Sequence, residues 1–203
     1  ELGQYANATI TPTVAAPPVP TASPNPSSDA WDTNQTINPL TNDAAGAVDF
    51  PLVATTVKLC GISPAETPNS CTQTTLEVPN EGTYTVDPTT GVVTFDPLPT
   101  FTGTATAITY QAVDELGQYV NATITPSVTA PAAPVAVNDT STDFLNVVQT
   151  KNPLSNDTTA DPLITLDPTS VRLCGTGETA PACTATSVSV TNGSYSVNTT
   201  TGV

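Results

Sequence analysis

Histidine and methionine are absent from the 203-residue sequence, and only three lysine and arginine residues are present. Without histidine, neither a Ser-His-Asp triad nor a Cys-His pair can be built, and the common zinc sites lose a preferred ligand. The 18 acidic residues give a formal net charge of −15. With only three basic residues, the sequence has no cluster of Lys and Arg. This argues against nucleic acid and an anionic membrane surface as partners.

Long apolar segments are also missing. No apolar run approaches the roughly 18 residues that a membrane span needs, and no signal-peptide core is present. We therefore expect no membrane insertion of this segment. The first residues, Glu1 to Tyr5, do not resemble a natural N-terminus, and we expect the sequence to be part of a longer chain.

Threonine, serine and proline are the abundant residues. The sequence has 41 Thr, 13 Ser and 21 Pro, whereas only 10% of its residues are charged. Thr and Val favour strands, while the Leu, Glu, Lys and Arg typical of helix surfaces are scarce. This composition predicts an all-β protein.

The sequence contains an internal repeat. ELGQYANATITPTV at residues 1–14 returns as ELGQYVNATITPSV at residues 115–128, and shorter matches follow around the cysteines. The two matching segments begin 114 residues apart, at residues 1 and 115. A repeating unit of this length is a domain rather than one turn of a solenoid. The matches predict the last strand of a preceding repeat at 1–14, a Pro-rich linker at 15–20, a complete repeat at 21–128, a second linker at 129–134 and a truncated repeat at 135–203.

Strand signals within the complete repeat come in short runs separated by turns. The sequence Asp87-Pro-Thr-Thr-Gly91 is typical of a tight turn, in which Gly91 can adopt a positive φ. Several short strands with frequent turns predict a two-sheet antiparallel sandwich. We expect strands at 76–78, 83–86, 92–95, 108–113 and 119–128.

Four cysteines allow three pairings. Because domains in a tandem array fold separately, we expect one local bridge in each repeat, Cys60–Cys71 and Cys174–Cys183. Their spacings do not fit the two close Cys-x-x-Cys pairs of a zinc ribbon. Closing a loop this short stabilises by roughly 2–3 kcal/mol, and persistent disulfides indicate a location outside the cytosol.

Catalysis has little support in the sequence. Asp and Glu are the only acid candidates, and a two-carboxylate glycosidase is the one chemistry that they could support. They stand in turn sequences such as Asp87-Pro88 and Asp114-Glu115, where capping is their ordinary role. Since no nucleophile–base pair is present, we expect no enzyme.

Four segments of the sequence carry a family resemblance: Val-Arg-Leu-Cys-Gly175, the stretches 101–110 and 192–203, and the Asp114-Glu-Leu-Gly-Gln-Tyr segment that runs to Thr-Ile-Thr-Pro126. Together they resemble the CshA-type fibril repeat of cell-wall-anchored fibrillar adhesins in bacteria. The resemblance implies tandem Ig-like β-sandwich modules, joined here by Pro-rich linkers, at the cell surface or in the cell wall. It carries over no catalytic residue, and the ligand-binding head of such adhesins is not seen here.

An Ig-like arrangement would gather three loops at one pole of each module. Carboxylate and amide oxygens from such loops are suitable calcium ligands, although Asn-Asp pairs also simply build turns. The expectation is therefore no cofactor, with calcium as a candidate stabiliser of the junctions. Its candidate ligands are Asp114, Glu115, Asn138, Asp139, Asn156 and Asp157, with Asn42-Asp43 as the first repeat's version.

The resulting hypothesis is a non-catalytic stalk that spaces an adhesive tip from the cell. Its expected partners are neighbouring repeats or chains of the same fibre, and the ligand of the tip is unknown. One alternative is a module that binds carbohydrate or a host protein, for which Trp31 is the candidate platform, although Leu145 replaces it in the second repeat. Another is an accessory module of a secreted enzyme.

Overall fold

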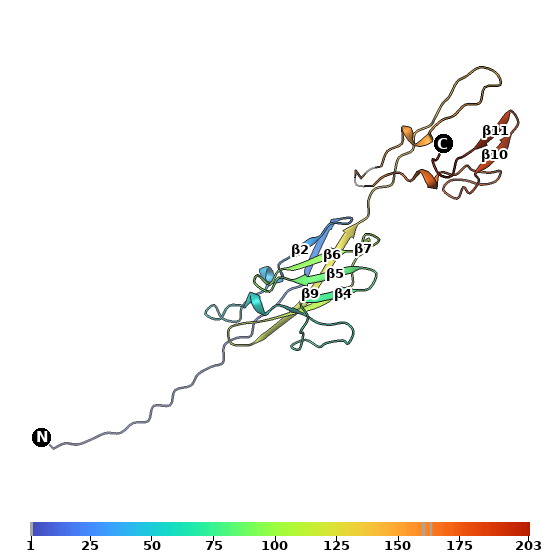
Figure 1. Ribbon diagram of the computed structural model, residues 1–203. Coiled ribbons are helices and arrows are strands. Elements are labelled where there is room, and N and C mark those ends of the chain that lie inside the picture. The colour runs from blue at the N-terminus through green and yellow to red at the C-terminus, as the bar shows by residue number, and fades with distance from the viewer. Residues whose placement is uncertain (1, 160, 163) are drawn as a thin grey trace. The chain divides into compact units, whose positions relative to one another are not determined.

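The computed structural model describes residues 2–159, 161–162 and 164–203, and its regular elements are β-strands and short 3-10 helices (Figure 1). The predicted all-β class is confirmed. Within the described residues, no helix has the length and apolar character to cross a membrane. The chain divides into two compact units, Glu1–Ala130 and Pro131–Val203, and each is described by itself.

The first unit contains two sheets. One has the strand order β1-β9-β8-β3, with the short β7 also paired to β9, and the other has the order β2-β6-β5-β4. The strands are β1 (Asn25–Ala30), β2 (Gln35–Ile37), β3 (Lys58–Leu59), β4 (Thr75–Val78), β5 (Gly82–Val86), β6 (Val93–Pro97), β7 (Gly103–Thr104), β8 (Ile108–Val113) and β9 (Tyr119–Thr129).

One strand pair departs from the predicted antiparallel sandwich. β1 runs parallel to β9, in a register from Asn25 opposite Ile124 to Ala30 opposite Thr129. Only a short hairpin forces neighbouring strands to be antiparallel, and β1 and β9 are the first and last strands of the repeat. The expectation of a wholly antiparallel sandwich is therefore wrong for this pair.

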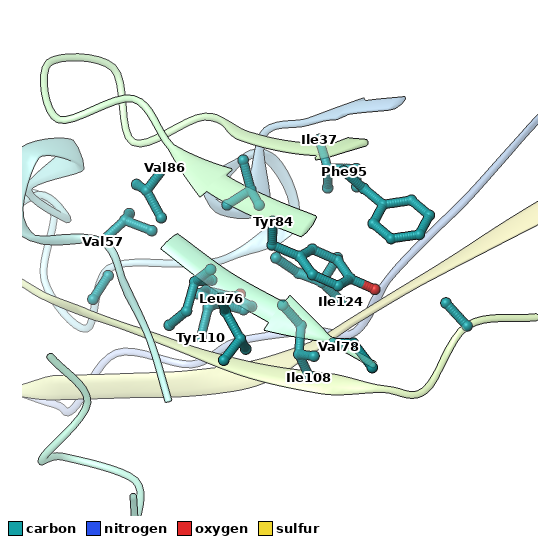
Figure 2. Packing of buried hydrophobic residues seen from close by; sticks show 14 of the residues in the cluster. Ile37, Val57, Leu76, Val78, Tyr84, Val86, Phe95, Ile108, Tyr110 and Ile124 are labelled. Carbon is teal, nitrogen blue, oxygen red and sulfur yellow. The ribbon is translucent and has the colours of Figure 1, made fainter. Parts of the chain in front are cut away.

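The core lies between the two sheets of the first unit. Tyr84 on β5 and Phe95 on β6 are fully buried, with ring centroids 4.6 Å apart, and the other sheet contributes Ile108 and Tyr110 on β8 and Ile124 on β9 (Figure 2). Burial alternates along β5 and β6, as expected for strands with one face on a core. The buried side chains of these two strands therefore lie on the face that packs against the other sheet.

Two short 3-10 helices and one tight turn connect the strands. η1 (Pro39–Asn42) is capped by the Asn38 side chain, which accepts from the N–H of Leu40 at 3.2 Å, and η2 (Ala54–Thr56) precedes β3. Gly91 has φ +70°, as the turn sequence predicted, and a Cβ there would lie 2.5 Å from the carbonyl oxygen of Ala54. Only glycine therefore fits this position without strain.

The second unit repeats local features of the first. It contains η3 (Pro153–Ser155), η4 (Pro168–Ser170), β10 (Ser187–Val190) and β11 (Gly193–Ser196). Its Tyr195, the counterpart of the fully buried Tyr84, is 62% exposed. Among the described residues, β10 and β11 pair only with each other, as a two-stranded antiparallel sheet.

Residues 2–14, predicted as the last strand of a preceding repeat, have no strand conformation, and Glu1 lies outside the described residues. The partners of such a strand would belong to the preceding repeat, so the expectation stays a prediction. Residues 2–14 are exposed and have no strand partner, whereas the nearly identical residues 115–128 contribute most of β9. A strand needs neighbours that accept and donate its backbone hydrogen bonds. β9 has β1, β7 and β8 as hydrogen-bonded neighbours. Residues 2–14 have no strand neighbour among the described residues.

Candidate functional site

The beginning of the first repeat is packed onto the repeat itself. Thr21 and Ala44 exchange two backbone hydrogen bonds, each 2.9 Å long, and Pro20 is buried. The backbone of Pro18 lies directly over Gly46, where a Cβ would be only 1.8 Å from the Pro18 carbonyl oxygen. The last residues of the predicted linker 15–20 are thus in contact with the repeat.

Asp43 joins this beginning to the core. Its Oδ1 accepts the backbone N–H of Ser23 at 2.9 Å, and its Oδ2 accepts the hydroxyl of Tyr110 at 2.6 Å. Tyr110 is fully buried, and this burial, together with the bond to Asp43, raises the pKa of its phenol. The second unit repeats the first contact, since Asp157 Oδ1 accepts the N–H of Val137 at 2.7 Å.

Each unit also has a disulfide. Cys60 is bonded to Cys71 and Cys174 to Cys183, with Cα atoms 4.2 and 4.4 Å apart. These are the pairs expected from the spacing. In the first unit the buried side chain of Gln111 on β8 accepts from the N–H of Cys71 at 2.9 Å and donates to its carbonyl at 3.1 Å. The disulfide loop is therefore fixed to the sheet at its second cysteine.

One carboxylate organises each disulfide loop. Glu66 accepts the N–H of Gly61 at 2.7 Å and both the hydroxyl and the N–H of Thr72, at 2.5 and 3.1 Å. These hydrogen bonds, that of Gly61 first, lower the pKa of Glu66 to about 2. Glu178 in the second unit accepts from Thr184 and Gly175 in the same way, which lowers its pKa as well.

Sequence reasoning missed these two glutamates, although a signal for them exists. In both repeats a glutamate stands inside the disulfide loop, and a threonine directly follows the second cysteine. The pairs Glu66–Thr72 and Glu178–Thr184 bond alike in the two units. The two loops differ in length, so a fixed residue offset does not align their glutamates. Alignment of the loops at their second cysteines and the following threonines would have identified Glu66 and Glu178 as equivalent.

The comparison with known families agrees with this repeated architecture. Residues 17–128 match the family model described as the surface adhesin CshA repetitive domain. The chain belongs to this family. No match was found among the curated proteins. The family and the two disulfides indicate an extracellular or cell-surface protein.

In this CshA repeat, two of the acidic residues proposed as calcium ligands, Asp114 and Glu115, lie in one turn. Asp114 is buried, and its Oδ1 accepts the N–H groups of Leu116 and Gln118 at 2.9 and 2.8 Å. Glu115 is exposed in the same turn and donates its backbone N–H to the carbonyl of Pro51 at 3.2 Å. These contacts are those of a turn before β9.

The candidates in the second unit are partly brought together. The Asn156 side chain donates to the carbonyl of Asn138 at 3.4 Å, and Asp157 bonds the adjacent Val137. Asp139 instead lies 3.5 Å from the ammonium group of Lys151. In the part of the chain that the structure describes, no three acidic or cysteine side chains form a group that could hold a metal ion.

Trp31, the candidate carbohydrate platform, is half-buried. It packs against the core cluster, and its indole N–H donates to the carbonyl of Pro99 at 2.8 Å. In the second unit, Leu145 is 90% exposed at the equivalent position. The contacts of Trp31 are those of a structural residue at the edge of the core.

Glu66 makes the stability of the first repeat depend on pH. Its pKa is about 2, compared with the ordinary value of 4.5, so its contribution is fully present above pH 4.5 and is lost as the pH falls towards 2. We expect the urea midpoint to fall across this range, with a smaller fall in Glu66→Gln. Trp31 fluorescence reports the transition, since it is the sole tryptophan.

The control for this prediction is Glu77→Gln, which removes an exposed carboxylate from β4. The control should keep the slope of the native protein. Part of the slope should remain in Glu66→Gln, because hydrogen bonds from the N–H groups of Thr90 and Thr89 also lower the pKa of Asp87. Equal slopes in the native protein and Glu66→Gln would contradict the assigned role.

Proposed function

We propose that the chain is a non-catalytic structural part of an extracellular adhesin stalk, in which tandem Ig-like sandwiches joined by Pro-rich linkers space an adhesive tip from the cell. The observation that carries the proposal is the match of residues 17–128 to an adhesin repeat, together with the return of that sequence in residues 135–203. Neighbouring repeats or chains of the same fibre are the proposed partners, and the cell wall is the proposed point of attachment.

The internal contacts of the repeat support a structural role. Its beginning is bonded to the core through Asp43, and its longest loop is closed by a disulfide and bonded to Glu66. These features fix the ends and loops of a domain, which is what a spacer requires. Trp31, whose N–H is bonded internally, also fits a spacer better than a carbohydrate-binding module.

The hollow in the second unit is consistent with the same role. It is lined in part by residues 131–134 and 164–167. In the first repeat, the counterparts of these residues contact the turn at 114–118: Leu52 bridges to Asp114, and Pro51 accepts from Glu115. In the first repeat these positions are engaged within the domain, so we do not base a ligand site on the hollow.

The proposal includes no metal cofactor. Asp43, Asp114 and Asp157 accept hydrogen bonds from the protein, which accounts for their positions without an ion. We expect thermal melts of the chain with calcium and with a chelator to have the same midpoint. Because a ligand that binds only the native state raises the midpoint, a calcium-dependent increase would instead support a junction site.

Antibody labelling of the source cells tests the proposed function. Antibodies raised against this chain should mark the outside of intact cells in immunogold images, at a distance from the membrane. In parallel, the purified chain should show no saturable binding on arrays of glycans and extracellular host proteins. Intracellular label would contradict the stalk, whereas saturable binding that Trp31→Ala abolishes would favour the ligand-binding alternative.

A further inference from the structure

The first and last strands of the repeat are hydrogen-bonded neighbours that run in the same direction. β1 and β9 pair over six positions, from Asn25 opposite Ile124 to Ala30 opposite Thr129 (Figure 1, β9 in yellow). We call β1 and β9 the terminal strand pair. The chain enters the repeat at the beginning of β1 and leaves it at the end of β9, so the two points of attachment lie at opposite ends of this pair.

We propose that the terminal strand pair makes the repeat resist tension, an inference that rests on the proposed function as a stalk. A pull on the two ends draws β1 towards its N-terminus and β9 towards its C-terminus. The strands must then slide along each other, which loads all of their hydrogen bonds together. Antiparallel terminal strands pulled from the same end would separate one bond at a time.

A buried glutamine fastens the terminal strand pair to the opposite sheet. The side chain of Gln35 on β2 is 3% exposed, accepts the hydroxyl of Ser27 on β1 at 2.5 Å and donates to the carbonyl of Ser127 on β9 at 2.8 Å. Both strands are thus held by one side chain from outside their own sheet. Sliding of β1 past β9 has to break at least one of these two bonds.

The contacts before β1 and within the disulfide loop lie outside the terminal strand pair. Thr21 exchanges two backbone hydrogen bonds with Ala44, and the N–H of Ser23 donates to Asp43. These bonds are fewer than those of the six paired positions, so this segment can detach first under tension. The bridge Cys60–Cys71 joins residues between β3 and β4. It should therefore not set the force at which the repeat opens, only the length that the opening releases.

Single-molecule pulling on the full chain, held at its two ends between marker domains of known unfolding length, tests the proposal. The first repeat should open in one cooperative step. Reduction of the disulfide adds a loop of sequence separation 11 to that step, or about 40 Å at ~3.6 Å per residue, which identifies the event. The opening force should be nearly the same in the oxidised and reduced protein.

Two buried glutamines provide a matched pair of variants. Gln35→Leu removes both bonds to the terminal strand pair, and it should raise the opening rate at a fixed force on the order of tenfold. Gln111→Leu removes two bonds of the same kind to Cys71, away from the pair. We expect Gln35→Leu and Gln111→Leu to lower the thermal midpoint to a similar extent. Gln111→Leu, however, should change the opening rate at fixed force by less than about threefold.

Equal effects of the two variants on the opening rate would overturn the proposal, as would gradual opening without a cooperative step. If Gln35→Leu does not fold, Ser27→Ala removes one of its two bonds and should give a smaller change in the same direction. The pulling result does not depend on where the protein lies in the cell. If antibodies label the cell surface but the repeat opens gradually at low force, the stalk proposal stands and the proposal of resistance to tension fails. If the repeat opens cooperatively at high force but the label is intracellular, only the stalk proposal fails.

Discussion

Replacement of Phe95 by alanine should lower the free energy of unfolding of the first repeat by about 3–5 kcal/mol, the usual cost of removing a buried phenylalanine. Phe95 is fully buried on β6, with its ring centroid 4.6 Å from that of Tyr84 and 6.4 Å from that of Phe101. Both aromatic contacts would be lost, and the space would fill poorly because β2 and β5 are bonded on either side. Urea titration followed by Trp31 fluorescence measures the change.

Phe144→Ala is the matched control for this substitution. Phe144 lies in the second unit and is 86% exposed, so its removal should alter the Trp31 transition by less than about 0.5 kcal/mol. A similar midpoint in the two variants would mean that Phe95 does not hold the core together. A loss of the Trp31 transition in Phe95→Ala would agree with the prediction, since a loss of this size is comparable with the whole stability of a small domain.

Removal of the first disulfide has the second largest expected effect. The double variant Cys60→Ala and Cys71→Ala frees a loop whose ends are 11 residues apart, and the loss of closure should cost about 2–3 kcal/mol. For a domain of this size we expect the thermal midpoint of the first repeat to fall by about 10 °C. Calorimetry and Trp31 fluorescence under oxidising conditions measure the shift.

The second disulfide provides the control for the first. Cys174→Ala with Cys183→Ala removes the bridge of the other unit and should leave the Trp31 transition in place. If the first double variant kept the native midpoint, then the bonds of Glu66 and Gln111 alone would suffice to order the loop. That outcome would contradict the stabilising role assigned to the bridge.

The strands of the core were predictable because runs of strand-forming residues are separated by turn sequences. The runs expected at 83–86 and 108–113 agree with β5 and β8 within one residue, and the turn that ends at Gly91 is present. β1 was missed because its sequence, NPSSDA, has no apolar alternation and contains Asn, Pro and Asp, which are all depleted in strands. Its strand conformation is due to the pairing with β9, which lies about a hundred residues away in the sequence.

The candidate site shows the same division. The cysteine pairs followed from spacing within each repeat, since local pairing requires only short-range information. The bonds of Asp43 to Ser23 and Tyr110, and that of Gln35 to Ser127, join residues that are distant in sequence. No local pattern in a single chain identifies such partners.

What the sequence determined by itself is the all-β class, the repeat and its cysteine pairs, because composition, period and spacing are local properties of the chain. The tertiary structure decided which segments become strands and which aromatic rings are buried. The polar segment 25–30 is a strand because it pairs with β9, and the ring of Tyr84 is buried because the two sheets pack over it. A strand takes its hydrogen bonds, and a ring its cover, from neighbours that only the folded repeat supplies.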